Sequence, residues 1–501
     1  MEKFYITTPI YYVNDRPHIG HAYATFAADT FARYHRLVGE RTLLLTGTDE
    51  NAEKNVEAAT REGESNVQDY VNRMSALWQV TWDELAISND DFIRTTEERH
   101  RRGVEKFWHA VEAAGDIYKG SYEGLYCVGC EAFYREADLT AEGLCPDHNR
   151  KPELVKEDNY FFRLSKYKQA LLDYHERNTG LVAPAARRNE VLNYITNHLE
   201  DISISRPSKG WGIPVPGDES QVIYVWFDAL LNYLTGVGYG TDEEKFNRWW
   251  PADLHIIGKD ITKFHCALWP AMLLAAGLPL PLRVFAHGFF TISGQKISKS
   301  LGNAIDPRDL VETYGVDALR YFLLREIPFG GDGDFSIERL AGRYDSDLAS
   351  GLGNYVSRVL TLAKDVDHLS VGDALRPIFE NTWREYHELF AANEPGRALE
   401  VIWQAIRAGD RYIDEQAPWV LKKDPQKKET LEIVLGTLVE SLRQLAWLLQ
   451  PLLPQTSDKI FILLGLEQEH DRPLAEASVW GSEVSAPKIA SPQPLFPRLT
   501  A

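Results

Sequence analysis

The chain has 501 residues, of which 44% are hydrophobic and 25% are charged, and its formal net charge is −19 at pH 7. This length suits roughly three to four domains of 100–200 residues each, and the composition is that of an ordinary globular protein. The charge argues against a non-specific nucleic-acid binder. The first residues carry no basic segment before an apolar core and so exclude a secretory signal, and the longest apolar run, residues 267–282, holds three prolines and is too short to span a membrane.

The first predicted elements are a strand, a helix and a second strand. Residues 3–8 are aromatic and β-branched, which favours a strand, and Pro9 is expected to end it. Apolar side chains recur at helical spacing over residues 22–38, and Gly39 suits a C-terminal cap. Residues 42–46 form a short apolar run that predicts the next strand. This order is typical of a parallel α/β sheet, in which ligands bind beyond the carboxyl ends of the strands.

Side chains suited to ligand binding stand at those ends. His18 and His21 lie where the helix begins, and imidazole N–H groups together with unpaired helix amides favour phosphate oxygens there. Gly20 has no side chain, so a base or ribose could approach the backbone closely. Asp49 follows the second strand as an acceptor suited to an ammonium group. The sequence therefore predicts one crevice around these four residues.

Three of the four cysteines gather in a short segment. Cys127 and Cys130 are separated by two residues, and the same spacing separates Cys145 from His148. Three thiolates and one imidazole can form a tetrahedral zinc site, which would be structural because no position remains for a reacting water. Four cysteines in the whole chain are too few for a disulfide scaffold and favour a reducing, cytoplasmic setting. Cys266 lies outside this spacing and is expected in the core.

Further strands and a mobile basic loop are predicted in the second half. Residues 255–260 and 284–289 are apolar and short, as buried strands are. A turn at residues 293–295 then leads into Lys296-Ile297-Ser298-Lys299-Ser300. Two lysines in a mobile loop can fold over a triphosphate, because nucleotidyl transfer depends mainly on positioning and on neutralising charge.

From about residue 347 helical periodicity dominates and predicts a helix bundle. Further apolar runs lie around residues 379–391, 397–414, 430–449 and 454–464. Asn354 and Arg358 fall one turn apart on one helix face, and Trp419 follows Pro418 just after a helix. An amide, a guanidinium and an aromatic ring are the groups that bind unstacked RNA bases. From the bundle pattern alone, Trp419 would be a core residue like Trp383, Trp403 and Trp447.

These segments together resemble a known family. His18-Ile19-Gly20-His21 and Lys296-Ile297-Ser298-Lys299-Ser300 resemble the two signature sequences of class I aminoacyl-tRNA synthetases, and the whole chain resembles the methionyl-tRNA synthetases of bacterial type with a single zinc knuckle. The other matching segments are Thr8–Asn14, Pro17–Ala22, Thr46–Glu50, Tyr126–Cys130, Ser205–Pro207, Tyr224–Ala229, Gly258–Ile261 and Asp414–Trp419.

The resemblance implies an α/β fold class: a Rossmann-type parallel-sheet catalytic domain with a zinc-knuckle insertion, followed by an all-α helix-bundle anticodon-binding domain. The catalytic domain would be split over residues 1–115 and 226–290, with the connective insertion over 116–225. Residues 291–346 would hold the lysine loop and contact the tRNA stem. Residues 347–480 would bind the anticodon, and residues 481–501 would form a tail that packs back.

The resemblance also implies roles for individual residues. ATP would contact His18, Gly20, His21, Lys296, Ser298 and Lys299. The catalytic residues would be His18, His21, Lys296, Lys299 and Arg206, with Arg206 assisting the lysine loop and Lys299 stabilising the transition state of activation. Methionine would contact Ile10, Tyr12, Asp49, Trp226, Ala229, Tyr233, Ile261 and His265, with its amino group on Asp49. One structural Zn²⁺ would be held by Cys127, Cys130, Cys145 and His148, and the anticodon would contact Asn354, Arg358 and Trp419.

The implied activity is the ATP-dependent activation of L-methionine to methionyl-adenylate and transfer of the methionyl group to tRNA(Met), for initiation and elongation of translation. Mg²⁺ would accompany ATP. No dimerisation module of the kind that some relatives carry follows the bundle, so we expect a cytoplasmic monomer with no membrane partner. Two positions depart from the family pattern. Ile297 replaces a methionine as an apolar anchor, and Asn51-Ala52 replaces His-Gly, which puts a role for an imidazole there in doubt.

Other functions remain open from the sequence. A cysteinyl enzyme would offer zinc to the substrate thiolate, but this zinc set is filled by protein ligands. The large leucyl, isoleucyl and valyl enzymes carry a long editing insertion for which the chain has no room. A nucleotidyltransferase without tRNA would not need the bundle residues Asn354, Arg358 and Trp419, and a non-catalytic RNA-binding protein would not need intact His18, His21, Lys296 and Lys299.

Overall fold

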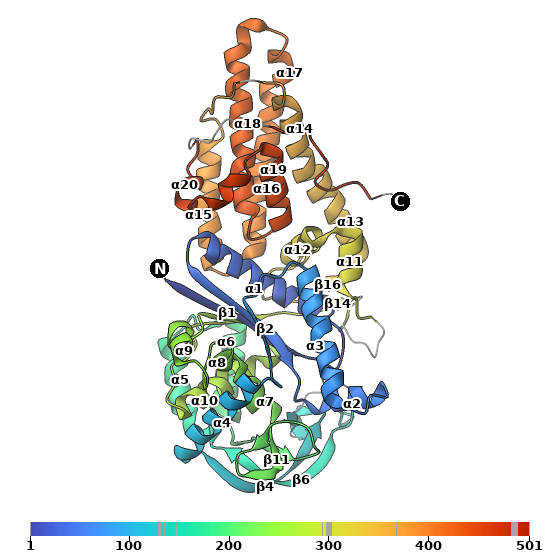
Figure 1. Ribbon diagram of the computed structural model, residues 1–501, viewed down its shortest axis with the longest axis vertical. Helices are drawn as coiled ribbons and strands as arrows, with labels where there is room; N and C mark the ends of the chain where they lie inside the picture. Colours follow the sequence, from blue (N-terminus) through green and yellow to red (C-terminus); the bar gives the residue numbers. More distant parts are fainter. Residues whose placement is uncertain are drawn as a thin grey trace. The chain divides into compact units, whose positions relative to one another are not determined.

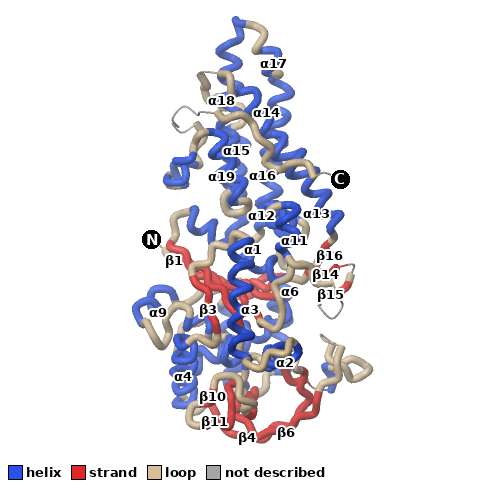
Figure 2. The backbone as a smooth tube through the Cα atoms, turned by 45° about the vertical axis from the view of Figure 1, so that its right-hand side comes forward, coloured by secondary structure: helices blue, strands red, loops and turns tan. Residues whose placement is uncertain are grey.

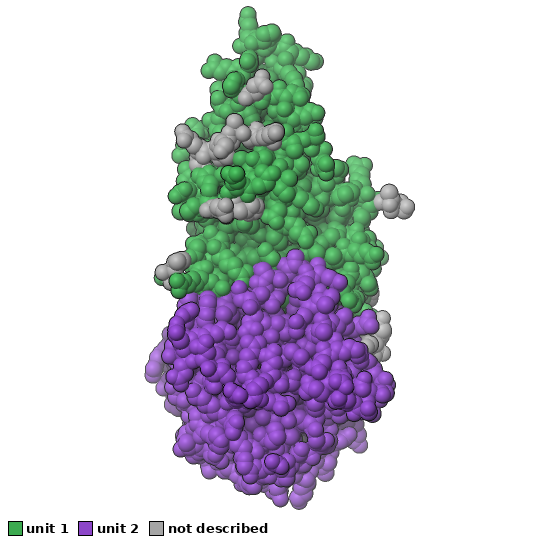
Figure 3. All heavy atoms as spheres, in the orientation of Figure 1, with its two compact units in different colours: residues 1–2, 18–42, 288–501 green, residues 3–17, 43–287 purple. Residues whose placement is uncertain are grey.

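The structure is a computed structural model that describes residues 2–128, 132–134, 136–146, 149–292, 294–296, 303–366, 368–481 and 489–499. The chain divides into two compact units (Figure 3). Unit 1 comprises residues 1–2, 18–42 and 288–501, and unit 2 comprises residues 3–17 and 43–287. Within the described ranges, no helix is long and apolar enough to cross a membrane.

Unit 2 is built on a six-stranded sheet with the strand order β3-β2-β1-β12-β13-β7, seen among the red strands of Figure 2. The strands are β1 (Lys3–Tyr12), β2 (Arg41–Asp49), β3 (Asp91–Arg94), β7 (Val182–Ala183), β12 (Leu254–Gly258) and β13 (Val284–His287). β2 and β3, β1 and β12, β12 and β13, and β13 and β7 all pair in parallel. The predicted parallel α/β fold is therefore confirmed. The order reverses at β1, which lies between β2 and β12, and a ligand site is expected beyond the carboxyl end of such a strand.

The expectation that Pro9 ends the first strand is wrong, because β1 continues to Tyr12. Proline removes a hydrogen-bond donor from a strand. β1 pairs with β12 through Ile6 and Thr7, two residues before the proline. Pro9 lies outside these paired positions, and Ile10 and Tyr12 follow it on the same strand.

Helices and buried aromatic rings complete unit 2. The helices are α2 (Glu53–Arg61), α3 (Val67–Glu84), α4 (Glu98–Ala113), α5 (Lys168–Arg177), α6 (Ala185–His198), α7 (Val225–Ala229), α8 (Asn232–Thr235), α9 (Glu243–Trp249) and α10 (Trp269–Ala275), with a π-helix at Phe264–Leu268 before α10. Trp78, Trp108 and Trp269 are fully buried. A side chain of this kind buries about 150–250 Å², so these three residues are major contributors to the core.

Two small antiparallel sheets are inserted after α4. Their strand orders are β5-β4-β6-β8 and β10-β11-β9. The strands are β4 (Ile117–Cys127), β5 (Ala132–Tyr134), β6 (Glu153–Phe162), β8 (Ile202–Ser203), β9 (Ser205–Pro207), β10 (Pro214–Val215) and β11 (Asp218–Ile223). The same stretch of chain also supplies β7 to the main sheet.

Unit 1 is mainly helical, as labelled in Figure 1, and the predicted helix bundle is confirmed. Its helices are α1 (Ile19–Leu37), α11 (Pro307–Tyr314), α12 (Val316–Arg325), α13 (Ile337–Arg343), α14 (Asn354–Ala363), α15 (Arg376–Ala391), α16 (Pro395–Gln416), α17 (Pro418–Leu421), α18 (Lys428–Leu449), α19 (Pro454–Leu464) and α20 (Leu474–Ala477), with a π-helix at Tyr344–Gly353. A small sheet has the order β15-β14-β16, formed by β14 (Phe290–Ile292), β15 (Gln295–Lys296) and β16 (Gly333–Phe335).

A buried ion pair joins α1 to α12 within unit 1. Arg320 donates from Nη1 to Asp29 Oδ2 at 2.6 Å, and both side chains are fully buried. The same guanidinium donates to the backbone carbonyls of Pro451 and Leu452 between α18 and α19. Removing one partner of such a pair costs about 3–5 kcal/mol, so this contact fixes α1 in its unit.

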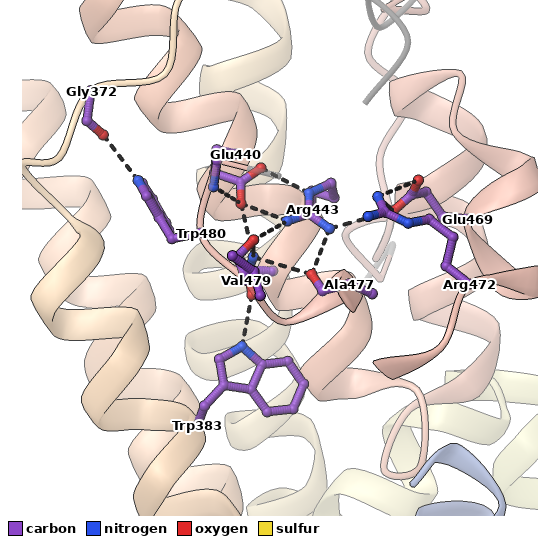
Figure 4. A network of polar contacts seen from close by, with 11 residues as sticks. Gly372, Trp383, Glu440, Arg443, Glu469, Arg472, Ala477, Val479 and Trp480 are labelled. Carbon is purple, nitrogen blue, oxygen red and sulfur yellow. Dashed lines mark hydrogen bonds and ion pairs between the residues drawn. The ribbon is translucent and has the colours of Figure 1, made fainter. Parts of the chain in front are cut away.

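A second buried polar network connects α18 to residues 477–479 near the end of the bundle (Figure 4). Arg443 on α18 binds Glu440 and Glu469 and donates to the carbonyls of Ala477 and Val479. The network continues through Gln444, which accepts from Trp383 Nε1 and donates to Glu440. Trp383, Trp403 and Trp447 are buried, as the bundle pattern predicted.

The end of the chain lies against unit 1. Ala490 N donates to the carbonyl of Leu463, and Tyr344 donates its hydroxyl to the carbonyl of Pro497. Leu495 and Phe496 are buried. These contacts hold residues 489–499 along α19 and the π-helix.

Candidate functional site

A small cavity lies beyond the carboxyl end of β1. Its volume is about 30 Å³, and it is lined by Pro9, Ile10, Tyr12, Asp49, Trp226, Ala229, Leu230, Asn232, Tyr233, Ile261 and His265. β1, the end of β2, α7 and the residue after it, α8, the turn after β12 and the π-helix at Phe264–Leu268 contribute these side chains. The structure thus brings together all eight residues that the resemblance implied for methionine. The sequence reasoning missed Pro9, Leu230 and Asn232, which are adjacent or close in sequence to predicted residues.

Aromatic rings form part of the cavity wall, namely those of Tyr12, Trp226 and Tyr233. Trp226 stacks on Phe264 with 3.9 Å between the ring centroids and an angle of 4° between the planes. Lys54 lies over the ring of Tyr12, 3.2 Å from its centroid. Flat apolar walls of this kind suit a polarizable thioether, because sulfur packs favourably against aromatic rings.

His265 is held as a neutral imidazole. Its Nδ1 lies 3.1 Å from the carbonyl of Ile261, which can only accept, so Nδ1 carries the proton. Nε2 therefore accepts from the hydroxyl of Tyr233 at 2.7 Å. Burial lowers the pKa of His265 to about 4 and raises the pKa of Tyr233 well above its usual range. The pair presents no charge to the cavity at neutral pH.

Asp49 supplies the carboxylate of the cavity. It is the last residue of β2 and is 3% exposed. Its backbone carbonyl accepts from Asn55 Nδ2 at 3.0 Å. A carboxylate this shielded from water attracts an ammonium group more strongly than an exposed one, because the effective dielectric constant is lower.

The residue after Asp49 anchors this segment. Glu50 is fully buried and forms a bidentate salt bridge with Arg94. Arg94 Nε donates to Oε1 at 2.7 Å, and Nη2 donates to Oε2 at 3.0 Å. Its backbone N–H donates to Thr95, and its carbonyl accepts from Trp211 Nε1 at 2.8 Å. The sequence reasoning missed this role. Its signal was an acidic residue directly after a buried strand, where an unpaired charge is rarely found.

His18 and His21 cap the start of α1 in unit 1. Gly20 N donates to His18 Nδ1 at 3.1 Å, and His18 N donates to His21 Nδ1 at 3.2 Å. Both Nδ1 atoms are acceptors, so each neutral ring carries its proton on Nε2. The rings stack with centroids 3.7 Å apart, and burial and the neighbouring His18 hold the pKa of His21 well below its usual range.

The expectation of unpaired amides at this helix end is wrong. Ile19 N donates to the carbonyl of Ile305, and Gly20 N is taken by the His18 ring. The amides of His21 and Ala22 donate to the His18 carbonyl. The imidazole Nε2–H groups, rather than the first amides, are therefore the donors that this turn can offer to a phosphate.

Arg206 lies on β9 of unit 2 between two tyrosine rings. Its guanidinium carbon is 4.5 Å from the centroid of Tyr224 and 5.3 Å from that of Tyr126. Nη1 donates to Ser203 Oγ and to the carbonyl of Ser205. The residue lines two cavities, of about 440 and 480 Å³. The side chain is thus anchored by Ser203 and Ser205 and borders both cavities.

Part of the predicted lysine loop lies within the described residues. Lys296 ends β15, where it pairs with Thr291 on β14. Ile297, Ser298, Lys299 and Ser300 lie outside the described residues. The predicted roles of Ser298 and Lys299 therefore stay predictions.

The predicted zinc ligands are described in part. Cys127 ends β4 and Cys145 lies in a turn, and both are buried. Cys145 N donates to the carbonyl of Arg150, and Asn149, with a positive φ of 51°, donates to the carbonyl of Cys145. Cys130 and His148 lie outside the described residues. Among the described residues, no group of three metal-ligating side chains occurs.

Asn354, Arg358 and Trp419 belong to the helical part of unit 1. Asn354 is exposed at the start of α14, and Trp419 is 45% exposed on α17, after the left-handed Ala417. The expectation of a core position for Trp419 is therefore wrong, and the interpretation as an exposed ring fits. Arg358 donates to Asp410 at 2.9 Å and to Asp414 at 2.6 Å, both on α16.

Comparisons with known proteins agree over the whole chain. A family described as "tRNA synthetases class I (M)" matches residues 4–153 and 147–360, and one described as "Anticodon binding domain of methionyl tRNA ligase" matches residues 369–501. A methionine–tRNA ligase of Thermotoga maritima is 45% identical over 511 aligned residues, which cover 100% of this chain and 81% of that protein. Its counterpart in Bacillus subtilis is 44% identical over 520, covering 99% and 78%.

A solved structure gives the same result. Mycobacterium tuberculosis methionyl-tRNA synthetase in complex with methionyl-adenylate superposes with a TM-score of 0.94 at 40% sequence identity. The superposition covers 99% of this chain and 100% of that one.

Proposed function

The chain belongs to the family of methionine–tRNA ligases, which are class I aminoacyl-tRNA synthetases, and from this premise we propose which of its residues carry out each step. It activates L-methionine with ATP to form methionyl-adenylate and transfers the methionyl group to tRNA(Met), in initiation and elongation. The role assigned to each side chain below is our proposal.

Methionine occupies the cavity beyond β1. Asp49 accepts the α-ammonium group, and the thioether lies against Trp226 and Tyr12, with Ile10, Ala229 and Ile261 completing the apolar wall. The Tyr233–His265 pair faces the same space without charge. An uncharged wall favours a thioether over charged side chains, since an unpaired charge in such a site is costly.

Methionine must widen this cavity to enter. A volume of about 30 Å³ holds roughly two waters, which is too little for a side chain with four heavy atoms. Trp226 lines the cavity and stacks on Phe264, which lies outside the lining, and we expect this side chain to move when methionine enters. Methionine binding is therefore expected to change the tryptophan fluorescence of the protein.

ATP is held through its phosphates and base. His18 and His21 offer their Nε2–H groups, and Gly20 allows the nucleoside to approach the backbone. Lys296, Ser298 and Lys299 bind the triphosphate together with Mg²⁺, which neutralises phosphate charge. A carboxylate oxygen of methionine attacks the α-phosphorus, and the bond to pyrophosphate breaks. Positive charge near the leaving pyrophosphate lowers this barrier, and this is the role of Lys299, assisted by Arg206.

The anticodon binds to the helical part of unit 1. Trp419 offers a stacking surface for an unpaired base, and Asn354 and Arg358 bind base edges. Asp410 and Asp414 hold the Arg358 guanidinium in place. A bound base or phosphate would share this guanidinium with the two carboxylates, which favours recognition of a particular base over simple charge attraction.

One structural zinc would be held by the knuckle. The buried Cys127 and Cys145 would supply thiolates, and Cys130 and His148, which lie outside the described residues, would complete the set. We expect one zinc per chain by elemental analysis, and loss of this zinc with reduced stability in Cys127→Ser. A content of two zincs, or none, would contradict this assignment.

The protein is further proposed to act as a monomer in the cytoplasm. Sedimentation equilibrium of enzyme that is active in tRNA charging tests whether the protein is a monomer.

The observation that carries the proposal is the convergence of eight predicted methionine contacts on one cavity. The experiment is amino-acid-dependent ATP–pyrophosphate exchange across the twenty amino acids, followed by charging of tRNA(Met). Exchange with methionine alone is expected. Exchange with another amino acid would overturn the substrate assignment, and no exchange with any of them would favour an RNA-binding protein that has lost its chemistry.

A further inference from the structure

A buried carboxylate that the reaction does not use lies behind the methionine cavity. Asp228 is on α7 between Trp226 and Ala229, and its side chain is fully buried. His100 Nε2 lies 2.7 Å from Oδ1, and Asn51 Nδ2 donates to Oδ2 at 2.7 Å. Both carboxylate oxygens therefore have a partner, as a buried charge requires.

The partners of Asp228 come from different elements. Asn51 is two residues beyond Asp49 in the segment that follows β2. His100 is on α4, and its other ring nitrogen lies 2.8 Å from Thr235 Oγ1 on α8, the helix that carries Tyr233. The chain of contacts thus links the part of the cavity that holds Asp49 with the two helices that hold its aromatic wall.

Asn51 Nδ2 is the donor that connects the segment after β2 to α7. Here the amide donates to Asp228 and, at 3.3 Å, to the carbonyl of Thr95. The adjacent Glu50 is tied to Arg94 and Trp211. Of these four contacts of Glu50 and Asn51, the hydrogen bond from Asn51 to Asp228 is the one that connects this segment to α7.

We propose that Asp228 is a positioning residue for methionine, which, through Asn51 and His100, sets the distance between the Asp49 carboxylate and the aromatic wall of the cavity. This inference rests on the proposed function of that cavity. A site must hold its groups within about 0.5 Å of the productive geometry. A buried carboxylate with two short contacts resists displacement more than apolar packing does, because each lost contact leaves charge unpaired.

Substitutions of Asn51 and Asp228, singly and together, test this inference. Asn51→Asp places two carboxylates at a hydrogen-bonding distance, and their repulsion forces the walls apart. The methionine KM in pyrophosphate exchange is expected to rise about 10- to 100-fold, by analogy with the effect of a displacement of 1 Å, while the KM for ATP stays within about 2-fold. Asn51→Ala, which removes the contact without adding charge, is expected to raise the methionine KM less.

The double variant Asn51→Asp with Asp228→Asn restores a donor and an acceptor in reversed order. The amide introduced on α7 can donate to the carboxylate introduced after β2 and can still accept from His100 Nε2. The methionine KM is therefore expected to return to within about 3-fold of the parent, in keeping with a restored pair contact. The thermal midpoint of each variant is measured alongside.

Three outcomes would overturn the inference. In the first, Asn51→Asp and Asn51→Ala lower the thermal midpoint and leave the methionine KM unchanged, as a purely structural role predicts. In the second, the double variant folds but its KM is not restored. In the third, Asn51→Asp does not fold and Asn51→Ala leaves the KM unchanged. Absence of methionine-dependent exchange in the parent enzyme is a different result, since it refutes the proposed function before any variant is compared.

Discussion

At the scale of single residues, backbone groups brought near by folding determine which ring nitrogen of each buried histidine carries the proton. The composition of the cavity beyond β1 follows from motifs around Tyr12, Asp49 and Trp226. The direction of the hydrogen bonds could not be read in advance, because it depends on carbonyls brought near by folding. The carbonyl of Ile261 sets the proton of His265 on Nδ1, and the capping contacts set those of His18 and His21 on Nε2.

The neutral state of His265 predicts a pH dependence of stability. Its pKa is about 4 in the folded protein and about 6.5 when unfolded. The folded pKa is depressed, so the stability that this residue contributes is complete above pH 6.5 and is lost as the pH falls toward 4. Between pH 7 and pH 5 the loss is about 2 kcal/mol. Urea unfolding at both pH values, in the parent and in His265→Gln, measures it.

In His265→Gln, the difference in the free energy of unfolding between pH 7 and pH 5 is expected to be smaller by about 2 kcal/mol. Other buried histidines, such as His175, have lowered pKa values for the same reason, burial, and leave a residual dependence in both proteins. An unchanged difference in the variant would show that His265 is not neutral in the folded state.

Trp419 allows a second test at this scale. Trp419→Ala is expected to leave methionine-dependent exchange intact and to lower kcat/KM for tRNA(Met) about 5- to 150-fold, because stacking on an aromatic side chain contributes about 1–3 kcal/mol per base. Val420→Ala is the matched control, since Val420 is the next residue and is 51% exposed. Equal effects of the two substitutions on charging would refute stacking on the indole.

At the scale of secondary structure, most helices and strands could be predicted, and the errors concentrate at their ends. The runs at residues 430–449 and 454–464 match α18 and α19 closely because each has a long buried face. The first strand was expected to stop at Pro9, yet it continues where the paired ladder no longer needs a donor. Helix α1 begins three residues before the expected start because His18 caps it with its own ring.

The buried network around Arg443 gives a prediction for the bundle. Arg443→Met is expected to destabilise unit 1 by about 3–5 kcal/mol, since it removes the guanidinium partner of the buried Glu440 carboxylate and one of the two guanidinium partners of Glu469. The measurement is the unfolding midpoint in urea.

Arg376→Met is the matched control for this prediction. Arg376 is also a helical arginine paired with glutamate, but its side chain and that of Glu380 are 49% and 57% exposed. Its loss is expected to cost at most about 1 kcal/mol. A similar cost for both substitutions would show that the Arg443 network adds little to stability.

At the scale of the whole molecule, the sequence motifs predicted the fold class but not the division of the chain into units. The methionine cavity is built within unit 2 from residues between Pro9 and His265, whereas His18, His21 and Lys296 belong to unit 1. This division could not be read from the order of motifs, because residues 18–42 interrupt one unit and belong to the other. It depends on long-range contacts such as the one between Asp29 and Arg320.

The division predicts that methionine binding and catalysis separate in variants. Lys299→Ala is expected to reduce kcat for exchange about 100- to 1,000-fold, the loss typical when one group that stabilises transition-state charge is removed. Equilibrium binding of methionine without ATP, followed by tryptophan fluorescence, is expected to stay within about 2-fold of the parent, because uniform binding of the substrate does not use that lysine. Loss of methionine affinity in this variant would contradict the separation.

The most direct test of the account is the KM for methionine of Asp49→Asn in ATP–pyrophosphate exchange at saturating ATP. Removing the charge from a buried carboxylate that binds an ammonium group costs about 2–5 kcal/mol, which corresponds to a rise in KM of about 30- to 4,000-fold. The KM for ATP is expected to stay near that of the parent. A methionine KM within about 3-fold of the parent would contradict the assignment of this cavity to methionine.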